Sequence, residues 1–494
     1  YRKCILAVLM VLGIVYYFAL PKELFNDPYA TVLNDFRGDL MSARIAADGQ
    51  WRFPPITQVP EKYEKALLTF EDQHFYKHPG VNPFALGRAL WQNVTEGEVV
   101  SGGSTISMQV IRMYRKGKGR TFQEKLTELV LATRLELRYT KSSILQLYAS
   151  HAPFGGNTVG LNAASWRYFQ RPPENLSWAE AALLAILPNQ PALLFPGRKN
   201  DRLKTKRDRL LKRLFDAGYM DQTSLDLAKS EPLPQGPERL PQKASHFLNY
   251  VNNMEGSGKI TNSSIDGFLQ DRVNNVLSAH HALLKTDGVH NAAVLVLDVK
   301  SNNVKAYAGN VVGSGSDHAS AVDVIQAPRS TGSLLKPFLY ASLLNEGAIL
   351  PRTLIPDVPT YFTDFAPKNF SRKYDGAVHA NMAISRSLNV PAVNMLRTYG
   401  YPKFHQKLID LGMSTLNQSP GYYGLTMILG GSEGTLWDMA NIYAGMSRTL
   451  SNYNHNPVTE RYNAHDIEFA LHKVVPGFER TSAVSQPVLG AASI

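Results

Sequence analysis

The sequence contains a single cysteine, Cys4, among its 494 residues. Neither an intrachain disulfide nor a metal site built from several cysteines can form. The chain also has no internal repeat, no heptad pattern and no low-complexity tract, which excludes repeat solenoids and long coiled coils. Hydrophobic residues make up 44% and charged residues 19%, so a largely disordered chain is excluded too. At about 150 residues per domain, a globular protein of roughly three units remains.

The charge balance favours an anionic partner. Lys and Arg number 52 and Asp and Glu number 41, which gives a formal net charge of +11. Such a surplus suits nucleic acid, anionic lipid or a phosphorylated substrate. No recognised nucleic-acid-binding motif is present. We therefore expect no nucleic acid partner.

Residues 4–20 form an uncharged run of 17 residues, CILAVLMVLGIVYYFAL. This length is at the short limit for a membrane span. Arg2 and Lys3 precede the run and favour an N-terminus in the cytoplasm. A cleaved signal peptide and a buried helix are the alternatives, but the residues around Leu20 make a poor cleavage site. We predict an uncleaved single-pass anchor in the cytoplasmic membrane, with the rest of the chain periplasmic or otherwise extracytoplasmic.

The patterns beyond this run predict an all-α part followed by an α+β part. Short strand-like pieces surround a turn at residues 48–49, and helical periodicity then predicts helices at 61–70, 84–93, 121–139 and 177–187. Four prolines mark a linker at 231–241. A β-hairpin is predicted over 292–311, and helices at 333–344 and 381–399. The predicted divisions are an anchor (1–20), a juxtamembrane segment (21–50), an all-α domain (51–220), a linker region (221–288) and an α+β domain (289–494).

Two further patterns on helices of the all-α part are also predicted. One apolar stripe runs along the helix at 121–139 and consists of Leu126, Leu129, Val130, Thr133 and Leu137. A basic run at 202–213 reads as a solvated helix face, which next to a membrane could meet lipid head groups.

The first chemical motif lies between residues 71 and 109. Glu71 and Asp72 end a helix before a His-Pro-Gly turn, and a carboxylate at such a place is a plausible general base. About 30 residues later comes SGGSTISMQ, whose Gly-Gly and hydroxyl side chains precede a helix and let backbone N–H groups approach an anion. Each motif alone is weak, because an acidic surface pair and a plain Gly-Ser loop are common.

Together the two motifs resemble the family 51 glycosyltransferase domain of bifunctional class A penicillin-binding proteins. The resemblance covers residues 51–219 and continues through Tyr148, the Pro-Phe-Gly-Gly at 153–156 and the AEAALLAILP segment at 179–188. The segment HPGVNPFALGRALWQN resembles the class 1C branch of this family.

This resemblance implies a lysozyme-like all-α domain that polymerises lipid II into glycan strands and releases polyprenyl pyrophosphate. It implies Glu71 as the base that deprotonates the acceptor hydroxyl and Glu128 as a second carboxylate. Cations must offset the charge of the leaving group. A divalent cation at the pyrophosphate stays open. The remaining implied substrate-binding residues are Asp72, Ser104, Thr105, Gln109, Arg112, Arg120 and Lys125.

The chain departs from the family pattern at Glu124, Thr127, Ser143 and Ser150. Glu124 replaces an arginine, and an anion near a pyrophosphate would weaken binding. A rival interpretation is therefore a non-catalytic cell-wall scaffold or β-lactam-binding sensor.

A second motif begins at Ser333. Ser333 and Lys336 form Ser-x-x-Lys at the start of an apolar helix, so that one helical turn places the lysine beneath the serine. About 50 residues later, Ser387 and Asn389 form Ser-x-Asn. Each pattern alone is weak. With the Pro-Lys-Asn-Phe at 367–370 and the Leu-Gly-Gly at 429–431, they resemble the penicillin-binding transpeptidase domain.

This second resemblance implies an acylated nucleophile, Ser333, with Lys336 as its base. Ser387 and Asn389 would relay the proton and contact substrate. The implied substrates are stem peptides ending in D-Ala-D-Ala, and β-lactams would acylate the same serine. The family's Lys-Thr-Gly does not occur before Ile494, and the sequence begins with Tyr1 rather than Met. We therefore expect a chain cut short at both ends, with the transpeptidase site incomplete.

Overall fold

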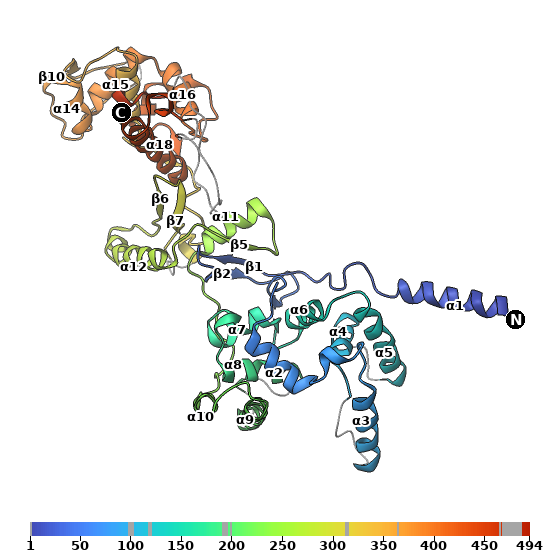
Figure 1. Ribbon diagram of the computed structural model, residues 1–494. Helices are drawn as coiled ribbons and strands as arrows, with labels where there is room; N and C mark the ends of the chain where they lie inside the picture. The colour runs from blue at the N-terminus through green and yellow to red at the C-terminus, as the bar shows by residue number, and fades with distance from the viewer. Residues whose placement is uncertain are drawn as a thin grey trace. The chain divides into compact units, whose positions relative to one another are not determined.

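In a computed structural model, the chain forms two compact units. The first comprises residues 1–34, 39–242 and 252–261, and the second comprises 35–38, 243–251 and 262–494 (Figure 1). The structure describes residues 2–96, 103–116, 121–189, 196–197, 200–311, 316–362, 365–463, 466 and 487–494.

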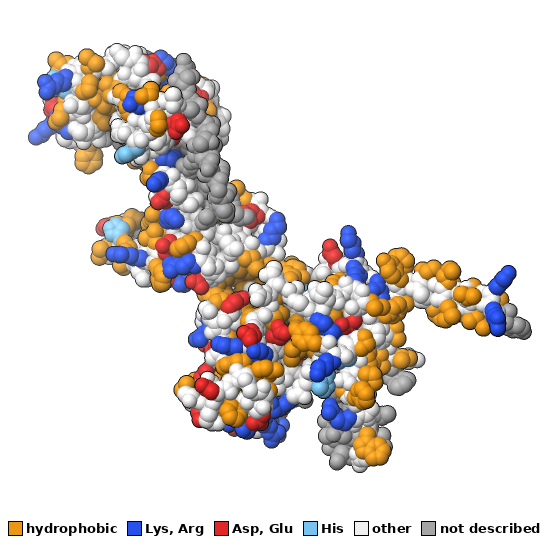
Figure 2. Space-filling model, in the orientation of Figure 1, with side chains coloured by type: hydrophobic (Ala, Val, Ile, Leu, Met, Phe, Trp, Pro, Cys, Tyr) orange, Lys and Arg blue, Asp and Glu red, His pale blue; other side chains and the backbone are white. Residues whose placement is uncertain are grey.

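Helix α1 (Arg2–Tyr17) begins the first unit, and hydrophobic side chains cover it in Figure 2. None of its described residues is buried. Within the part of the chain that the structure describes, no helix combines the length and the apolar character needed to cross a membrane. The anchor at residues 1–20 therefore stays a prediction.

The C-terminal end of α1 is held by α5 (Phe122–Glu136) and the turn after it. The hydroxyls of Tyr16 and Thr133 share a hydrogen bond of 2.9 Å. The Arg134 guanidinium donates to the Tyr17 carbonyl at 3.0 and 2.9 Å, and Arg138 donates to the backbone just beyond. The last carbonyls of a helix have no partner within it, so these arginines complete the end of α1.

Short strands accompany the helices of the first unit. A three-stranded sheet has the order β2–β1–β5, in which β1 (Thr31–Asn34) and β2 (Leu40–Arg44) are antiparallel and β5 (Ile260–Asn262) lies on the other side of β1. Strand β3 (Trp51–Arg52) pairs in parallel with β4 (Thr158–Val159). The predicted turn at 48–49 lies between β2 and β3.

The rest of the first unit is helical, although the pair of β3 and β4 lies within the segment at 51–220 that we predicted to be all α. Helix starts follow local capping chemistry: Ser177 and Glu180 form a capping box, and Thr105, Thr121 and Thr140 cap three other helices. The helices, besides α5, are α2 (Glu61–Glu71), α3 (Pro83–Glu96), α4 (Ile106–Tyr114), α6 (Lys141–His151), α7 (Leu161–Phe169), α8 (Trp178–Ile186), α9 (Asn200–Asp216) and α10 (Gln222–Ser230).

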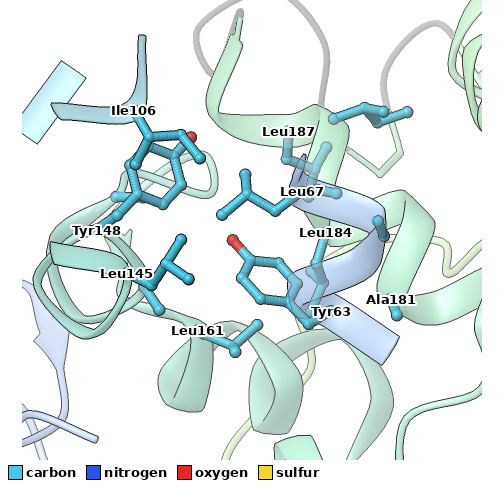
Figure 3. Close-up of a cluster of buried hydrophobic side chains, with 14 of the residues drawn as sticks. Tyr63, Leu67, Ile106, Leu145, Tyr148, Leu161, Ala181, Leu184 and Leu187 are labelled. Atoms are coloured by element: carbon cyan, nitrogen blue, oxygen red, sulfur yellow. The ribbon is translucent and has the colours of Figure 1, made fainter. Parts of the chain in front are cut away.

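These helices enclose one buried core (Figure 3). Tyr63 and Leu67 project into it from α2, Tyr148 from α6 and Leu184 from α8, each at most 1% exposed. Burying one such side chain contributes about 1.5–3 kcal/mol. The polar ends of α2 and α4 therefore lie next to a tightly packed hydrophobic core.

Most of the predicted apolar stripe of α5 does not face this core, although Leu129 packs against it. Leu126, Val130 and Leu137 are 54%, 47% and 74% exposed, whereas Leu131 and Leu135 are buried. The face turned inward includes a charged residue, Glu128, which is 4% exposed. The periodicity was correct, but burial of a carboxylate cannot be read from an apolar pattern.

The basic run on α9 is mostly solvated, as predicted, because its exposed members are Arg202, Lys204, Arg209, Lys212 and Arg213. Arg207 is 1% exposed and donates to the carbonyls of Lys229 and Glu231 at 3.1 and 2.7 Å. Arg213 donates to the Thr69 carbonyl in α2. Arg207 is therefore the buried exception in this run, whereas Arg213 stays exposed while it bonds to α2.

The second unit mixes helices with two-stranded sheets. The predicted hairpin is confirmed as β6 (Val294–Asp298) and β7 (Asn303–Ala308), which are antiparallel. Its helices are α11 (Ser245–Glu255, whose last four residues belong to the first unit), α12 (Gly267–Leu284), α13 (Lys336–Asn345), α14 (Ala380–Ser385), α15 (Asn389–Tyr399), α16 (Tyr401–Asp410), α17 (Pro420–Tyr423) and α18 (Leu436–His455). The other strand pairs are β9 (Leu354–Asp357) with β10 (Gly376–His379), and β8 (Arg329–Ser330) with β11 (Glu433–Gly434).

Two predicted helices of this unit were wrong in detail. Helix α13 begins at Lys336, so Ser333 lies in the preceding turn and not in the helix. The helix predicted at 381–399 is two helices, because Ser387 between them has φ of +51°. That left-handed conformation is unfavourable for a residue with a side chain and ends a helix.

Candidate active sites

Glu71 is the last residue of α2, and its carboxylate faces two amide side chains. Gln109 on α4 donates from Nε2 to Glu71 Oε2 at 2.7 Å, and Asn189 donates from Nδ2 to Oε1 at 3.4 Å. Burial raises the pKa of Glu71, and these hydrogen bonds offset only part of that rise. Asp72 adds to it, whereas Arg112 opposes it. A carboxylate with a raised pKa binds a proton more readily, as a general base must.

The carboxylate of Asp72 is buried and bonded to the protein itself. Both of its oxygens lie 3.0 Å from His78 Nε2, and the Ile106 N–H donates to Oδ2 at 3.2 Å. The Gly80 N–H donates to His78 Nδ1 at 3.2 Å, so the ring proton is on Nε2 and is donated to Asp72. Asp72 therefore ties the turn after α2 to the start of α4. Its predicted contact with substrate stays a prediction.

Thr105 has the same kind of internal role. Its hydroxyl donates to the Gly80 carbonyl at 2.6 Å and accepts from the Met108 N–H at 3.2 Å, which caps α4. Gly80 has φ of +92°, and a Cβ there would lie 2.6 Å from the Ala132 carbonyl oxygen. Only glycine fits this turn, which brings the first motif against α5.

A second group of side chains forms a polar cluster. It consists of the charged residues Arg112, Lys125 and Glu128 and of the neutral Ser104 hydroxyl. The Arg112 guanidinium binds both oxygens of Glu128 at 2.8 Å. Lys125 Nζ lies 3.4 Å from Glu128 Oε2 and donates to Ser104 Oγ at 2.6 Å. Three residues that the sequence assigned to substrate are thus brought together around the second predicted carboxylate.

The cluster keeps Glu128 ionised. Burial raises the pKa of Glu128, but the hydrogen bonds and charges of Arg112 and Lys125 outweigh it, and the pKa is lowered. Arg112 also lies close enough to Glu71 for their charges to interact. One arginine therefore links the two carboxylates electrostatically.

The departures from the family pattern have partners within the protein. Glu124 makes a two-point ion pair with Arg115, whose Nη2 lies 2.9 Å from Oε2. Arg115 therefore offsets its charge. Thr127 and Ser143 make hydrogen bonds within their own helices, and Ser150 accepts from the Ile56 N–H at 3.2 Å. The remaining predicted cation, Arg120, lies outside the described residues.

A divalent cation at the pyrophosphate stays a prediction. Within the described ranges, no group of three or more His, Cys, Asp or Glu side chains is placed to hold one. Glu128 already has cations on both oxygens. The chain's own Arg112 and Lys125 are better placed to meet an anion here.

In the second unit, Lys336 is 1% exposed and surrounded by neutral oxygens. Its ammonium donates to the Ser387 carbonyl at 2.8 Å, to Ser387 Oγ at 3.2 Å and to Asn389 Oδ1 at 2.7 Å. Burial lowers the pKa of Lys336 to about 8. A lysine in this state supplies a neutral amine near physiological pH.

Ser333 stands one turn before this lysine. Its backbone carbonyl accepts from the Lys336 N–H at 3.2 Å, and its side chain is exposed. Among the residues that the structure describes, the Ser333 hydroxyl makes no hydrogen bond. Among the described residues, Lys336 therefore hydrogen-bonds to Ser387 and not to the hydroxyl of the predicted nucleophile. Hydrogen bonds of catalytic groups commonly tighten only when substrate binds.

A buried amide orients Asn389. Asn369 Oδ1 accepts from the N–H groups of Asn389 and Val390 at 2.9 and 3.2 Å, so it caps α15 from outside the helix. Its Nδ2 donates to Asp357 Oδ1 at 2.7 Å. This network fixes the helix that presents Asn389 to Lys336.

Comparisons with known proteins match both units. Residues 39–215 match the transglycosylase family, and residues 292–426 match the transpeptidase domain of penicillin-binding proteins. The chain thus carries a transglycosylase domain followed by a penicillin-binding protein transpeptidase domain. It is 38% identical to penicillin-binding protein 1C of Escherichia coli (strain K12) over 403 residues, which cover 81% of this chain and 52% of that protein.

Two further relatives show the same relation. Penicillin-binding protein 1B of Escherichia coli (strain K12) is 31% identical over 427 residues, 78% of this chain and 50% of that protein. Penicillin-binding protein 4 of Bacillus subtilis (strain 168) is 29% identical over 401 residues, 75% of this chain and 64% of that protein. The chain thus spans 50 to 64% of the length of these three penicillin-binding proteins.

Sequence patterns did not identify several residues of these sites. Asn189 donates to Glu71 from just after α8, and only its place at the end of an apolar helix hints at it. Arg115 offsets Glu124 across two helices, and Asp357 holds Asn369 from a distant strand. Such pairings depend on tertiary packing and leave no spacing signal.

Proposed function

We propose that this protein polymerises lipid II through its transglycosylase domain. The observation that carries the proposal is the arrangement around Arg112, where Glu71 with a raised pKa and Glu128 with a lowered pKa lie within reach of one guanidinium. Two carboxylates whose surroundings shift their pKa values apart can serve as a base and as a fixed anion.

In the proposed reaction, Glu71 takes the proton of the acceptor sugar hydroxyl. That oxygen bonds to the anomeric carbon of the growing chain with inversion, while the bond from that carbon to the pyrophosphate oxygen breaks. Arg112 and Lys125 offset the charge of the departing polyprenyl pyrophosphate, with Arg120 as a further predicted cation. Ionised Glu128 holds Arg112 and Lys125 in place.

We further propose that the second domain, in the full-length protein, cross-links stem peptides. Lys336, neutral above a pKa of about 8, accepts the proton of Ser333. The serine oxygen then attacks the carbonyl between the two D-Ala residues, the C–N bond breaks, and the terminal D-Ala leaves as an amine that takes the proton from Lys336. The amine of a second stem peptide then attacks the acyl-serine, which forms the cross-link and returns the free serine. Ser387 and Asn389 supply neutral oxygens beside the lysine. A β-lactam would acylate Ser333 in the same way.

For localisation, we propose a single-pass protein of the cytoplasmic membrane with extracytoplasmic catalytic domains. Support comes from the uncharged run at 4–20, from the basic pair before it and from the exposed apolar surface of α1. Lipid II, glycan strands and stem peptides are the proposed partners. No nucleic acid partner is proposed.

The test is incubation of the purified protein with fluorescently labelled lipid II, with Glu71→Gln as the matched variant. Wild type is expected to form glycan polymers, and the variant to lose them because glutamine accepts no proton. Absence of product from wild type would support the rival scaffold or sensor function. Equal product from both proteins would remove Glu71 as the base.

A further inference from the structure

A chain of side chains leads from the protein core to the carboxylate of Glu71. Tyr148 on α6 is 1% exposed, and its hydroxyl donates to Gln109 Oε1 on α4 at 3.5 Å. Gln109 Nε2 then donates to Glu71 Oε2 on α2 at 2.7 Å. Three helices thus meet at one amide group, which lies between a buried phenol and the proposed base.

The chemistry of the three groups fixes the orientation of the amide. An ionised carboxylate only accepts hydrogen bonds, so Gln109 must present its NH2 group to Glu71. Its oxygen then faces Tyr148, whose hydroxyl can donate. Tyr148 therefore selects the amide orientation that stabilises the ionised form of Glu71.

Other groups near Glu71 act in both directions. Asp72 raises its pKa and Arg112 lowers it, while burial is the largest influence and raises it. Tyr63 and Tyr148 also lie close enough for the Glu71 charge to raise their own pKa values. Arg213 on α9 donates to the carbonyl of Thr69, which lies two residues before Glu71 in α2. Asn189, just after the end of α8, donates to Glu71 itself.

We propose that Gln109, held in one orientation by Tyr148, is a positioning residue that aims the Glu71 carboxylate and keeps it ionised until the acceptor hydroxyl arrives. The inference rests on the proposed glycosyl transfer with Glu71 as base. It replaces the predicted role of Gln109 as a direct substrate contact.

The structure offers a matched control in Tyr63. It is as buried as Tyr148 and projects into the same core (Figure 3). Within the described residues, however, its hydroxyl has no hydrogen-bond partner. Tyr63→Phe therefore removes a buried hydroxyl from the same core without touching the link to Glu71.

The experiment is the pH dependence of lipid II polymerisation, with thermal unfolding of each variant in parallel. Gln109→Met removes a donor to an ionised group, and we expect about a tenfold or larger loss of kcat. We also expect the acid limb of the pH–rate profile, where the rate falls as Glu71 is protonated, to move to higher pH. Tyr148→Phe should shift the limb in the same direction with a smaller loss, about threefold, because its contact is the longer one. Tyr63→Phe should leave the limb in place.

Three outcomes overturn the inference. The first is an unshifted acid limb in Gln109→Met, and the second is an equal shift in Tyr63→Phe and Tyr148→Phe. The third is a Gln109→Met variant in which only KM rises, which would restore the role of substrate contact. A wild-type protein without product at any pH overturns the proposed function itself, and is thereby distinguishable from the other three.

Discussion

The two carboxylates of the transglycosylase site occupy contrasting surroundings. Glu71 is held by neutral amides, and burial raises its pKa. Glu128 is equally part of the site, but Arg112 and Lys125 lower its pKa despite burial. The comparison shows that the partners, and not burial alone, decide in which direction the pKa of each carboxyl moves.

In the second unit, burial shifts the pKa of a cationic group, Lys336. Lys336 has only neutral oxygens as hydrogen-bond acceptors within the described residues, and burial lowers its pKa to about 8. Burial disfavours the charged form of any group, so it strengthens a carboxylate as a base and frees the lone pair of a lysine.

The largest expected effect is that replacing Glu71 lowers the polymerisation rate more than replacing Glu128 does. Glu71→Gln should lower polymerisation about a thousandfold or more, because a general base is lost. Glu128→Gln should lower it about a hundredfold, because the change frees two cations without removing the base. Initial rates with labelled lipid II measure both. A larger loss in Glu128→Gln would reverse the assignment.

The next expected effect concerns the lysine. Lys336→Met should slow acylation of Ser333 by fluorescent penicillin about a hundredfold or more in the full-length protein. In the unmodified protein, acylation should rise with pH and reach half its maximum near pH 8, where the neutral amine becomes the major form. Ser333→Ala is the control without label. A rate that falls as pH rises through 8 would contradict this role.

Arg112 tests the link between the two acids. Arg112→Met should lower polymerisation about a hundredfold, since it removes positive charge from the leaving group and both hydrogen bonds from Glu128. Arg112→Lys keeps the charge but not the two-point geometry, and a loss of about tenfold is expected. Equal losses in the two variants would show that charge without geometry explains the site.

The smallest expected effect is at Glu124. Its ion pair with Arg115 is partly exposed, at 15% and 24% for the two side chains, and such pairs contribute about 1 kcal/mol or less. Glu124→Gln should therefore change polymerisation less than about threefold. A rise of tenfold or more would show that Glu124 does oppose pyrophosphate binding, as the departure from the family pattern first indicated.

Much of this organisation could be predicted from the sequence, because local patterns determine it. The helix starts at Thr121 and Ser177 and the hairpin at 292–311 follow from capping and alternation. The Glu71 and Glu128 positions came from family motifs, and the structure places both beside Arg112.

The remainder depends on tertiary contacts that spacing does not encode. Most of the apolar stripe of α5 is exposed, and the buried side of the helix carries Glu128 with its cations. Ser387 interrupts the helix that the periodicity predicts. It adopts a left-handed backbone conformation, and its carbonyl accepts a hydrogen bond from Lys336. The amides that hold Glu71 come from α4 and from the end of α8.

The most direct test of the contrast between the two carboxylates is a titration of both in one protein. Carbon-13 NMR of labelled glutamate carboxyls, assigned with Glu71→Gln and Glu128→Gln, measures each midpoint without any substrate. The predicted result is a Glu71 pKa above the usual value of 4.5 and a Glu128 pKa below it. Coincident midpoints, or the reverse order, would contradict the assignment of Glu71 as base and Glu128 as fixed anion.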